Sequence, residues 1–564
     1  MSINIYYYTF FYLLIPISTI GYGLTFLHLS NNQKINSNFG YSGLFGVFFL
    51  IAYSYITHLF FPHSSIHNLI LAIVGFFLFI FFSIKRLKNL RKKILLFLIV
   101  FSALYIASFI FKTHDDFPYY HFSYSYHLTQ NDLIIGIGKF NHGYRTPSSI
   151  FYLNSLFYLP KTSFYLFHIS AIMIMGFSNI ILLSKIQKSI QFKKINFLSY
   201  YCLLAFIFIN VFFYRLGEHG TDRSAQILIF LLVMEIIIFI NYKNDRKTSI
   251  GLIYMLMAII ISLKAFYILY FIFFIPIITN LIIKNKLKDS FLILTNNLYF
   301  LFFCIIIFFI FFSSLANTGC FLYPIKITCI NFLEWSIPLK EVQLMNDWYE
   351  QWSKGGAGPN FRVEKPDEYI KYFNWFPNWV NIYFFNKVSD FLYGIIFITI
   401  IVLSIFFSRK KVKVEKKINL NLTLILLLIL LFEWFYNHPA LRYGGYVLIG
   451  LIIFIPLAKK IEQYKNSFDQ VSKKIYFLII LVFIIFLARN VTRIFKEVDQ
   501  YHYKPLKNVY YHVDKNHFRI NDKFSLLIQG YEECILLSNN CKEVMVSNVL
   551  VKKKFGKYIF INQK

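Results

Sequence analysis

Residues 291–313, FLILTNNLYFLFFCIIIFFIFFS, contain no charged side chain. An α-helix rises about 1.5 Å per residue, so an apolar run of this length crosses the hydrocarbon core of a bilayer, which is roughly 30 Å thick. Comparable runs recur along the 564-residue chain, which is 57% hydrophobic and 15% charged, whereas soluble domains carry about a quarter charged residues. We therefore predict an all-α polytopic membrane protein with about fourteen transmembrane helices. The predicted spans are 4–27, 41–60, 67–84, 94–112, 162–184, 196–214, 225–241, 249–263, 266–283, 291–313, 387–408, 419–436, 445–458 and 476–488.

Lys and Arg side chains gather in alternate loops between these runs. Such loops lie on the cytoplasmic side of a membrane, so both chain termini are expected on the extracytoplasmic side. No basic residue precedes Lys34, which agrees with an outside N-terminus and predicts no cleavable signal peptide in MSINIYYYTFFYLL. Because most of the net charge of +30 lies in these loops, we expect no nucleic-acid partner. The basic loops run from Lys85 to Lys93, Lys185 to Lys194, Lys243 to Lys247, Lys284 to Lys288, Arg409 to Lys417 and Lys459 to Lys474.

The predicted spans divide the chain into three membrane regions and three longer extracytoplasmic segments. Residues 1–112, 162–313 and 387–488 form the membrane regions, 113–161 an acidic loop and 314–386 a Trp-rich loop. Residues 489–564 are predicted to form a small mixed α/β tail, with strand-like runs from Glu543 to Val551 and from Tyr558 to Asn562. Tryptophans either anchor helices at the membrane interface or stack on sugar rings, and the sequence leaves both interpretations open. The Trp-rich loop contains Trp335, Trp348, Trp352, Trp375 and Trp379.

Four cysteines occur in two close pairs outside the apolar runs. The predicted topology places all four on the extracytoplasmic side, where disulfides persist. We therefore predict two disulfide bonds, with free thiols as the alternative. Cys202 and Cys304 fall within predicted spans. The predicted pairs are Cys320 with Cys329 and Cys534 with Cys541.

The acidic loop begins with THDDFPYYHF, residues 113–122. Asp115 and Asp116 therefore follow the predicted span 94–112 directly and should lie at the outer membrane surface. Two adjacent carboxylates repel each other, so one pKa should rise unless a cation or a metal neutralises the pair. Such a pair suits a general base, or a ligand set for a divalent metal such as Mg²⁺ or Mn²⁺. The alternative is that one of them only caps a helix from Tyr119 to Leu128.

Further polar residues in the outer loops are candidate substrate-binding groups. The loop RLGEHGTDRS, residues 215–224, is dense in such groups, with an exposed salt-bridged turn as the alternative. Lys264 and Arg442 each lie in a short turn between apolar spans, where a charge is costly and often functional, although snorkelling to the interface is an alternative. Glu235 falls inside a predicted span and needs a partner or a proton. The candidate residues are His114, Tyr119, His121, His142, Arg145, Glu218, His219, Asp222, Arg223, Lys264, Arg442 and Tyr443.

A membrane helix followed by an outer loop with paired acidic residues resembles the GT-C superfamily of polytopic glycosyltransferases. The run DFPYYH at residues 116–121 looks loosely like the Asp-Pro-aromatic-aromatic-Asn-Tyr-Arg motif of oligosaccharyltransferase catalytic subunits. Asp115 and Asp116 match in charge the Asp-Glu pair of protein mannosyltransferases. The chain departs from these families because its acidic loop follows the fourth predicted span and it has no WWDYG-like motif. The stretches HDDFPYYHF and FNHGYRTPSSIFYLNSLFYLP are also similar to a family of bacterial membrane proteins without an assigned activity, which implies the bacterial inner (cytoplasmic) membrane.

The GT-C resemblance implies transfer of a sugar from a polyprenyl-phosphate carrier in the bilayer to a glycan or protein acceptor. Asp115 or Asp116 would take the proton of the acceptor hydroxyl. Fixed cations would stabilise the departing phosphate, and arginine is favoured because its planar fork meets phosphate in a bidentate way. The cations expected in this role are Arg145, Arg223, Lys264 and Arg442.

Other functions that act on lipid-linked saccharides remain open. A flippase or exporter of lipid-linked saccharides fits about fourteen spans, but exporters need few large outer loops and show polar residues along several spans. A polysaccharide polymerase or ligase would share the carrier and the outer-face chemistry and differ in the unit transferred. A non-catalytic assembly scaffold is the last alternative.

Overall fold

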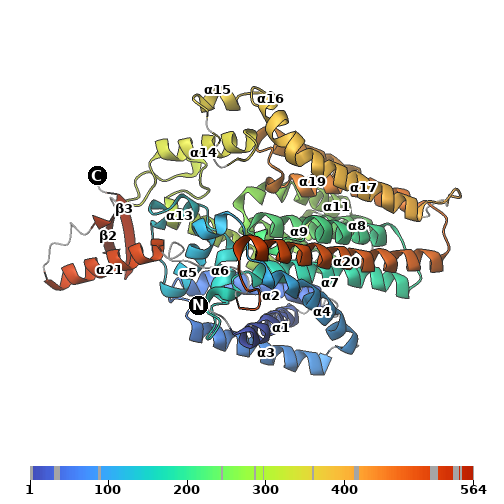
Figure 1. Cartoon of the computed structure of the whole chain (residues 1–564), viewed down its shortest axis with the longest axis horizontal. Helices are drawn as coiled ribbons and strands as arrows, with labels where there is room; N and C mark the ends of the chain where they lie inside the picture. The colour runs from blue at the N-terminus through green and yellow to red at the C-terminus, as the bar shows by residue number, and fades with distance from the viewer. Residues whose placement is uncertain are drawn as a thin grey trace.

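The computed structural model describes residues 4–30, 38–86, 90–242, 246–284, 287–295, 297–358, 361, 363–411, 418–507, 519–537, 545–546, 549–554 and 556–562. Figure 1 shows long helices lying side by side along the longest axis of the molecule, with short helices and a small sheet toward one end of the bundle. Thr9 Oγ1, near the start of α1 (Ile5–Leu29), lies 2.5 Å from Tyr105 Oη, just before the acidic loop. Strand β3 (Lys557–Asn562) pairs with Ile135 of that loop. Both described ends of the chain therefore lie at the same end of the bundle.

Within the described residues, ten helical segments are long and apolar enough to cross a membrane, and three shorter apolar helices accompany them. Large apolar side chains such as Phe397 and Ile400 remain exposed on their outer faces, which requires a hydrocarbon surrounding. The expectation of an all-α polytopic membrane protein is confirmed. Besides α1, the long helices are α2 (Phe39–His58), α3 (Ser65–Arg86), α4 (Leu90–Tyr105), α7 (Ile169–Gln191), α8 (Phe197–Phe212), α9 (Asp222–Asn241), α10 (Arg246–Leu263), α11 (Phe274–Lys284), α13 (Leu298–Thr318), α17 (Ser389–Phe406), α18 (Asn421–Asn437), α19 (Gly445–Glu462) and α20 (Phe468–Tyr501).

The remaining helices connect these helices or belong to the outer segments and the tail. They carry many of the polar side chains because backbone outside the hydrocarbon region is free to turn and to bond water. They are η2 (Ile106–Phe109), η3 (Phe117–His121), α5 (Phe122–Gln130), η4 (Ile137–Lys139), η5 (His142–Arg145), α6 (Ser149–Ser155), η6 (Phe164–Leu166), η7 (Leu216–Glu218), η8 (Ala265–Phe273), α12 (Leu287–Thr295), η9 (Lys326–Thr328), α14 (Leu339–Lys354), α15 (Pro366–Ile370), α16 (Phe376–Trp379), η10 (Val380–Val388), η11 (Leu441–Tyr443) and α21 (Arg519–Leu537).

Two predicted spans differ from the helices that the structure contains. The apolar run 291–313 is divided, because α12 ends at Thr295 and the side chain of Asn297 caps α13 by accepting a hydrogen bond from the Phe300 amide at 2.8 Å. The predicted span 94–112 ends early, since α4 stops at Tyr105 and only a short 3₁₀ turn continues to Phe109. The chain therefore enters the acidic loop in a non-helical conformation, which sets the position of the residues that follow.

Helices α7 and α9 form the centre of the bundle, and their hydrophobic side chains are almost entirely buried. Glu235 lies on α9 and accepts a hydrogen bond from the Tyr41 hydroxyl. Lys185 Nζ lies 3.3 Å from the same carboxylate. The partner that this intramembrane acid requires is therefore supplied by α2 and α7.

Helices α1 and α2 approach each other closely at glycines. A Cβ atom added at Gly23 would lie 1.7 Å from the Ser42 carbonyl oxygen, and one added at Gly46 would lie 1.8 Å from the Thr19 carbonyl oxygen. Small residues of this kind let transmembrane helices pack backbone against backbone. Neither contact is with a flexible side chain, so a larger residue has to push the helices apart.

We expect Gly46→Ala to destabilise the protein by about 1–3 kcal/mol, the usual cost of overpacking. The measurement is the thermal unfolding midpoint of the purified protein in detergent. Gly358→Ala is the matched control, because an added Cβ there meets nothing within 4 Å. An unchanged midpoint for Gly46→Ala would contradict the close packing of α1 on α2.

The Trp-rich loop folds over the end of the bundle and is held by one disulfide. Cys320 and Cys329 are bonded to each other, which confirms the first predicted pair. Trp375 and Trp379 are buried rather than exposed, and Trp379 Nε1 donates a hydrogen bond to the Pro439 carbonyl at 3.0 Å. These two tryptophans therefore pack within the fold.

The described part of the tail contains α21 and a three-stranded antiparallel sheet in the order β1 (Met545–Val546), β2 (Val549–Lys554), β3. Phe524 of α21 packs against Phe140 of the acidic loop and Phe560 of β3, with ring centroids 4.5 and 5.8 Å away. The tail thus packs on the acidic loop. Cys541 lies outside the described residues, so the predicted pairing of Cys534 with Cys541 remains a prediction.

Candidate functional site

Four charged residues from distant parts of the chain meet at the end of the bundle that carries the acidic loop. Arg442 Nη2 lies 3.0 Å from Asp116 Oδ2, and Arg442 Nε lies 3.2 Å from Asp222 Oδ2. Lys264 Nζ forms an ion pair with the other oxygen of Asp222. We call these four residues the Asp116–Arg442 network. Two carboxylates and two cations balance each other, which makes their partial burial tolerable.

Each member of this network is placed by a different element. Asp116 immediately precedes η3, Asp222 is the first residue of α9, and Lys264 separates α10 from η8. Arg442 lies in η11, and the chain leaves this turn through Gly444, whose φ of +114° suits a residue without a side chain. All four therefore lie at element ends, where side chains can converge without interrupting helical hydrogen bonds.

Neighbouring groups fix the orientation of the two cations. The Arg442 guanidinium lies 5.1 Å from the ring centroid of Trp352, and Lys264 Nζ lies 4.1 Å from that of Tyr443. Such cation–π contacts favour a charged group over the ring face. Gln226 of α9 donates to the Arg442 carbonyl at 2.8 Å, which ties the turn to α9. Trp352 and Gln226 were not expected from the sequence.

Two histidines flank Asp116. The Asp116 amide donates to His114 Nδ1 at 3.1 Å, and the His114 and His121 rings stack with centroids 5.5 Å apart. Burial lowers the pKa of His121 to about 3, and burial followed by the charge of Arg442 lowers the pKa of His114. Both imidazoles are therefore neutral at neutral pH. Gly220 lies against both rings, so the loop that contains Asp222 touches this pair directly.

The two carboxylates of the network have different exposure. Burial acts to raise the pKa of Asp116, but the charge of Arg442 and its hydrogen bond act against burial, and the pKa lies below its usual value. Asp116 is therefore ionised at neutral pH. Its side chain is 28% exposed, whereas that of Asp222 is 7% exposed. Asp116 is thus the more accessible of the two carboxylates, and Asp222 is bound to both cations.

Asp115 points away from this network. Its side chain is 90% exposed and lies 3.9 Å from Lys112 Nζ. The structure therefore does not bring the two adjacent carboxylates together. Nor does either cap the following helix with its side chain: η3 begins after Asp116 without a side-chain cap, and Asp115 lies outside it.

The residues that best match a metal-ligand set are His114, Asp116 and His121, whose ligand atoms all lie within 4.8 Å of one another. His121 Nε2 is buried and has no hydrogen-bond partner among the described residues, which suits a ligand atom. Two imidazole nitrogens and one carboxylate favour Zn²⁺, Mn²⁺ or Fe²⁺ over Mg²⁺. Arg442 opposes metal binding at this set, because its positive guanidinium is bound to the Oδ2 atom of Asp116. The set differs from the predicted Asp115–Asp116 pair.

Several predicted residues lie outside the Asp116–Arg442 network. Arg145 is buried and bound to Glu341 at 2.8 Å and to the Gly138 carbonyl at 2.8 Å, so it holds the acidic loop against α14. His142 and Tyr119 are exposed, and within the described residues neither forms a hydrogen bond or an ion pair with the network.

The loop 215–224 contains a second set of ion pairs. Glu218 Oε1 accepts from Arg493 Nη2 at 2.9 Å, and Glu218 Oε2 lies 3.6 Å from Arg223 Nη1. His219 is buried, and its Nε2 lies 2.6 Å from the Phe213 carbonyl oxygen. The loop is therefore a salt-bridged turn, which was the alternative interpretation of its sequence. That interpretation expected an exposed turn, whereas α20 packs over this one. Arg493 was not expected from the sequence.

A comparison with known proteins places these elements in one family. No curated protein and no solved structure matches the chain. A family model described as a domain of unknown function, DUF8201, matches residues 6–449. This range contains all four residues of the Asp116–Arg442 network and ends in α19, before α20 and the tail. Because the match covers well over half of its length, the chain belongs to the DUF8201 family.

Proposed function

We propose that this protein is a GT-C-like glycosyltransferase that uses a polyprenyl-phosphate-linked sugar as donor. The observation that carries the proposal is the convergence of Asp116, Asp222, Lys264 and Arg442 at one end of an apolar helix bundle. Sugar transfer from a lipid phosphate needs an accessible base and fixed cations at the level of the lipid headgroups. The network offers both, and the resemblance of DFPYYH to GT-C loops supports the assignment.

The proposed topology has about fourteen transmembrane helices, with the network on the extracytoplasmic side of the bacterial inner membrane. Ten long and three shorter apolar helices in the described residues support this number, with α19 as a further span. Loops rich in Lys and Arg lie on the opposite side in this arrangement, and both chain ends lie outside. A glycan or protein acceptor would then approach from the outer aqueous phase.

In the proposed reaction, the acceptor oxygen attacks the anomeric carbon of the donor sugar. The bond between that carbon and the phosphate oxygen breaks, and its electron pair stays with the departing lipid phosphate. Asp116 takes the proton of the acceptor hydroxyl. A carboxylate of lowered pKa suffices when the hydroxyl becomes acidic late, as in an oxocarbenium-like transition state.

Arg442 and Lys264 stabilise the charge that develops on the departing phosphate. Their side chains are 32% and 25% exposed, so a lipid phosphate can reach both. Asp222 remains buried and holds both cations in place, which reduces the reorganisation needed during the reaction. If a divalent metal is bound, His114, Asp116 and His121 would hold it, and it would supply further neutralisation of the phosphate charge.

The test is a purified preparation in nanodiscs incubated with a panel of polyprenyl-phosphate- and polyprenyl-diphosphate-linked sugars. We expect release of the lipid phosphate together with a new glycoside for at least one donor and acceptor. A panel that produces neither, with a folded protein, argues against the proposal.

A flippase for lipid-linked saccharides is the second candidate function, because Glu235, Lys185 and Tyr41 form a charged cluster inside the bundle. Ionisable residues inside membrane segments often mark a transport path. Movement of a lipid-linked sugar across protein-containing vesicles that hold no acceptor would favour this function, and a Glu235→Gln variant should then stop it.

A further inference from the structure

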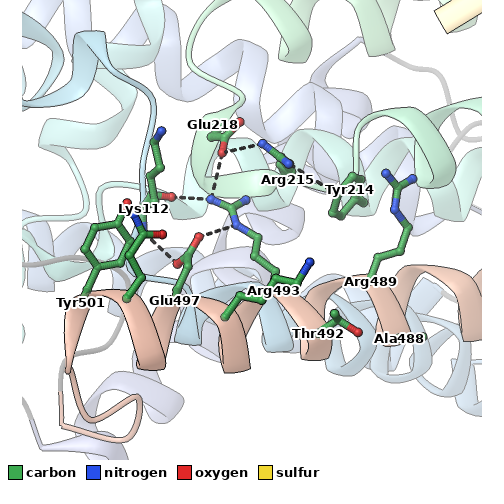
Figure 2. Close-up of a pocket in the computed structure, with 12 residues that line it drawn as sticks. Lys112, Tyr214, Arg215, Glu218, Ala488, Arg489, Thr492, Arg493, Glu497 and Tyr501 are labelled. Carbon is green, nitrogen blue, oxygen red and sulfur yellow. Dashed lines mark hydrogen bonds and ion pairs between the residues drawn. The ribbon is translucent and has the colours of Figure 1, made fainter. Parts of the chain in front are cut away.

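A separate cavity of about 500 Å³ lies between the last turns of α20, the loop around η7 and the residues that lead into the acidic loop. Figure 2 shows its lining, with side chains of α20 along the bottom and Glu218 and Arg215 above them. A cavity of this size holds a lipid head group or a similar small polar group. Its lining residues are Lys112, Tyr214, Arg215, Glu218, Ala488, Arg489, Thr492, Arg493, Lys496, Glu497, Gln500 and Tyr501.

The lining carries an excess of positive charge. Five of these side chains are basic and two are acidic. Both carboxylates are already bound: Glu497 Oε1 accepts from Arg493 Nε at 2.6 Å, and Glu218 Oε1 accepts from Arg493 Nη2 at 2.9 Å. Glu218 Oε1 also lies 3.4 Å from Arg215 Nη1, so Lys112, Arg489 and Lys496 have no acidic partner in the lining.

Arg493 forms part of the cavity wall and is not a surface side chain. The Arg493 side chain is 9% exposed, and Figure 2 shows its guanidinium between Glu218 and Glu497. Its Nη1 is buried and has no hydrogen-bond partner among the described residues. A buried donor left in this way costs free energy unless a ligand or water accepts from it. An anion in the cavity would supply such an acceptor.

Other cations are held in place around the same space. The Arg489 guanidinium lies 3.7 Å from the ring centroid of Tyr214, and its Nη1 donates to the Val211 carbonyl at 2.6 Å. Burial acts to raise the pKa of Tyr214, but Arg215 and Arg489 outweigh it and lower that pKa. Lys496 is exposed one turn of α20 after Thr492. The guanidinium groups of Arg489 and Arg493 are therefore ordered before any ligand binds, which favours an anion.

The face of the same helix that points away from Arg493 is apolar. Ile484, Val491 and Phe495 are exposed large apolar residues of α20, at a spacing of seven and then four residues. That spacing puts them on one face of the helix, as a stripe directed at lipid. The predicted span of α20 ends at residue 488, so Arg489 and the residues after it lie at the level of the lipid headgroups.

We propose that this cavity, at the end of a membrane-facing helix and at the level of the headgroups, binds the phosphate group of a membrane lipid. Arg489, Arg493 and Lys496 would contact the phosphate oxygens through charge-assisted hydrogen bonds. The cavity shares no lining residue with the Asp116–Arg442 network. The loop 215–224, in which Arg223 lies 3.6 Å from Glu218, and the segment from Lys112 to Asp116 connect the two. This binding does not require that the protein be a glycosyltransferase.

The test compares lipids with and without a phosphate on the purified full-length protein. Dioleoyl phosphatidic acid and dioleoylglycerol share their acyl chains and differ in the phosphate group, and native mass spectrometry measures the affinity of each. We expect phosphatidic acid to bind more tightly and Arg489→Gln/Lys496→Gln to weaken it at least tenfold. Lys473→Gln/Lys474→Gln, at the other end of α20, is the matched control and should bind as the unmodified protein does.

Three results would overturn the proposal. The first is equal binding of the two lipids, and the second is unchanged binding of phosphatidic acid by Arg489→Gln/Lys496→Gln. The third is displacement of phosphatidic acid by inorganic phosphate at similar concentrations, which would assign the cavity to a free anion. If the double variant does not fold, Lys496→Gln alone replaces it, because Lys496 is exposed on the surface of α20.

Discussion

Asp116→Asn is expected to lower the rate of donor turnover by about 10²–10⁴-fold, the usual contribution of a positioned general base. The amide keeps the shape of the side chain but cannot take a proton from the acceptor hydroxyl. It also leaves Arg442 bound to Asp222 at 3.2 Å, so the guanidinium keeps one carboxylate partner. The measurement is the turnover number with saturating donor and acceptor in nanodiscs.

Asp115→Asn is the matched control for this variant. It removes a carboxylate from the adjacent position, but that side chain is 90% exposed and points away from the network. Surface substitutions of this kind change stability by at most about 0.5 kcal/mol, and activity should stay within about twofold of the unmodified protein. Loss of activity in Asp115→Asn with full activity in Asp116→Asn would reverse the assignment. Full activity in both variants would show that neither carboxylate acts as the general base.

Arg442→Gln is expected to lower turnover by about 10²–10³-fold, comparable to the loss of one fixed donor from an oxyanion site. Arg442→Lys should recover only part of the rate, because a lysine keeps the charge but not the planar fork that bridges Asp116 and Asp222. Arg409→Gln is the control, since Arg409 is exposed and belongs to a basic loop predicted on the opposite side of the membrane from the network. The measurement again is donor turnover, with the unfolding midpoint recorded for each variant.

A purely structural role for Arg442 predicts a different pattern. Removing it leaves Asp116 and Asp222 without their shared partner, and breaking a buried pair costs about 3–5 kcal/mol. The double variant Asp222→Asn/Arg442→Gln keeps the base Asp116, removes one of those uncompensated charges and should regain stability. If activity returned together with stability, Arg442 would only hold the fold; we expect stability to return without activity.

The sequence predicts the membrane class and the members of the site better than their arrangement. Lys264 and Arg442 stand out because a charge between two apolar spans is costly and is often functional. Asp116 and Asp222 stand out because they follow or precede such spans directly. Their pairing could not be read from the sequence, because 220 positions separate Asp222 from Arg442 and 326 separate Asp116 from it.

The sequence did not identify Trp352, Arg493 or Glu497 for the same reason: their partners lie far away along the chain. Trp352 belongs to a group of five similar tryptophans, and only its contact with Arg442 distinguishes it. Arg493 and Glu497 lie beyond the predicted end of a span at residue 488, although their spacing of four residues is typical of a helical ion pair. That spacing would have shown that α20 continues as a helix out of the apolar region.

The choice between Asp115 and Asp116 also depends on the fold. Both residues have the same chemistry and the same neighbours in the sequence. The helix α4 ends at Tyr105, and after the short helix η2 the chain runs without helical structure from residue 110 until η3 begins after Asp116. The direction of each side chain is set by that path and by Arg442, neither of which appears in the local sequence.

The most direct measurement is an electron cryomicroscopy structure of the protein bound to a non-cleavable polyprenyl-phosphonate sugar. The account predicts phosphonate density within hydrogen-bonding distance of Arg442 and Lys264, with the anomeric carbon beside Asp116. Density at another place, with the ion pairs among Asp116, Asp222, Lys264 and Arg442 unchanged, would contradict it.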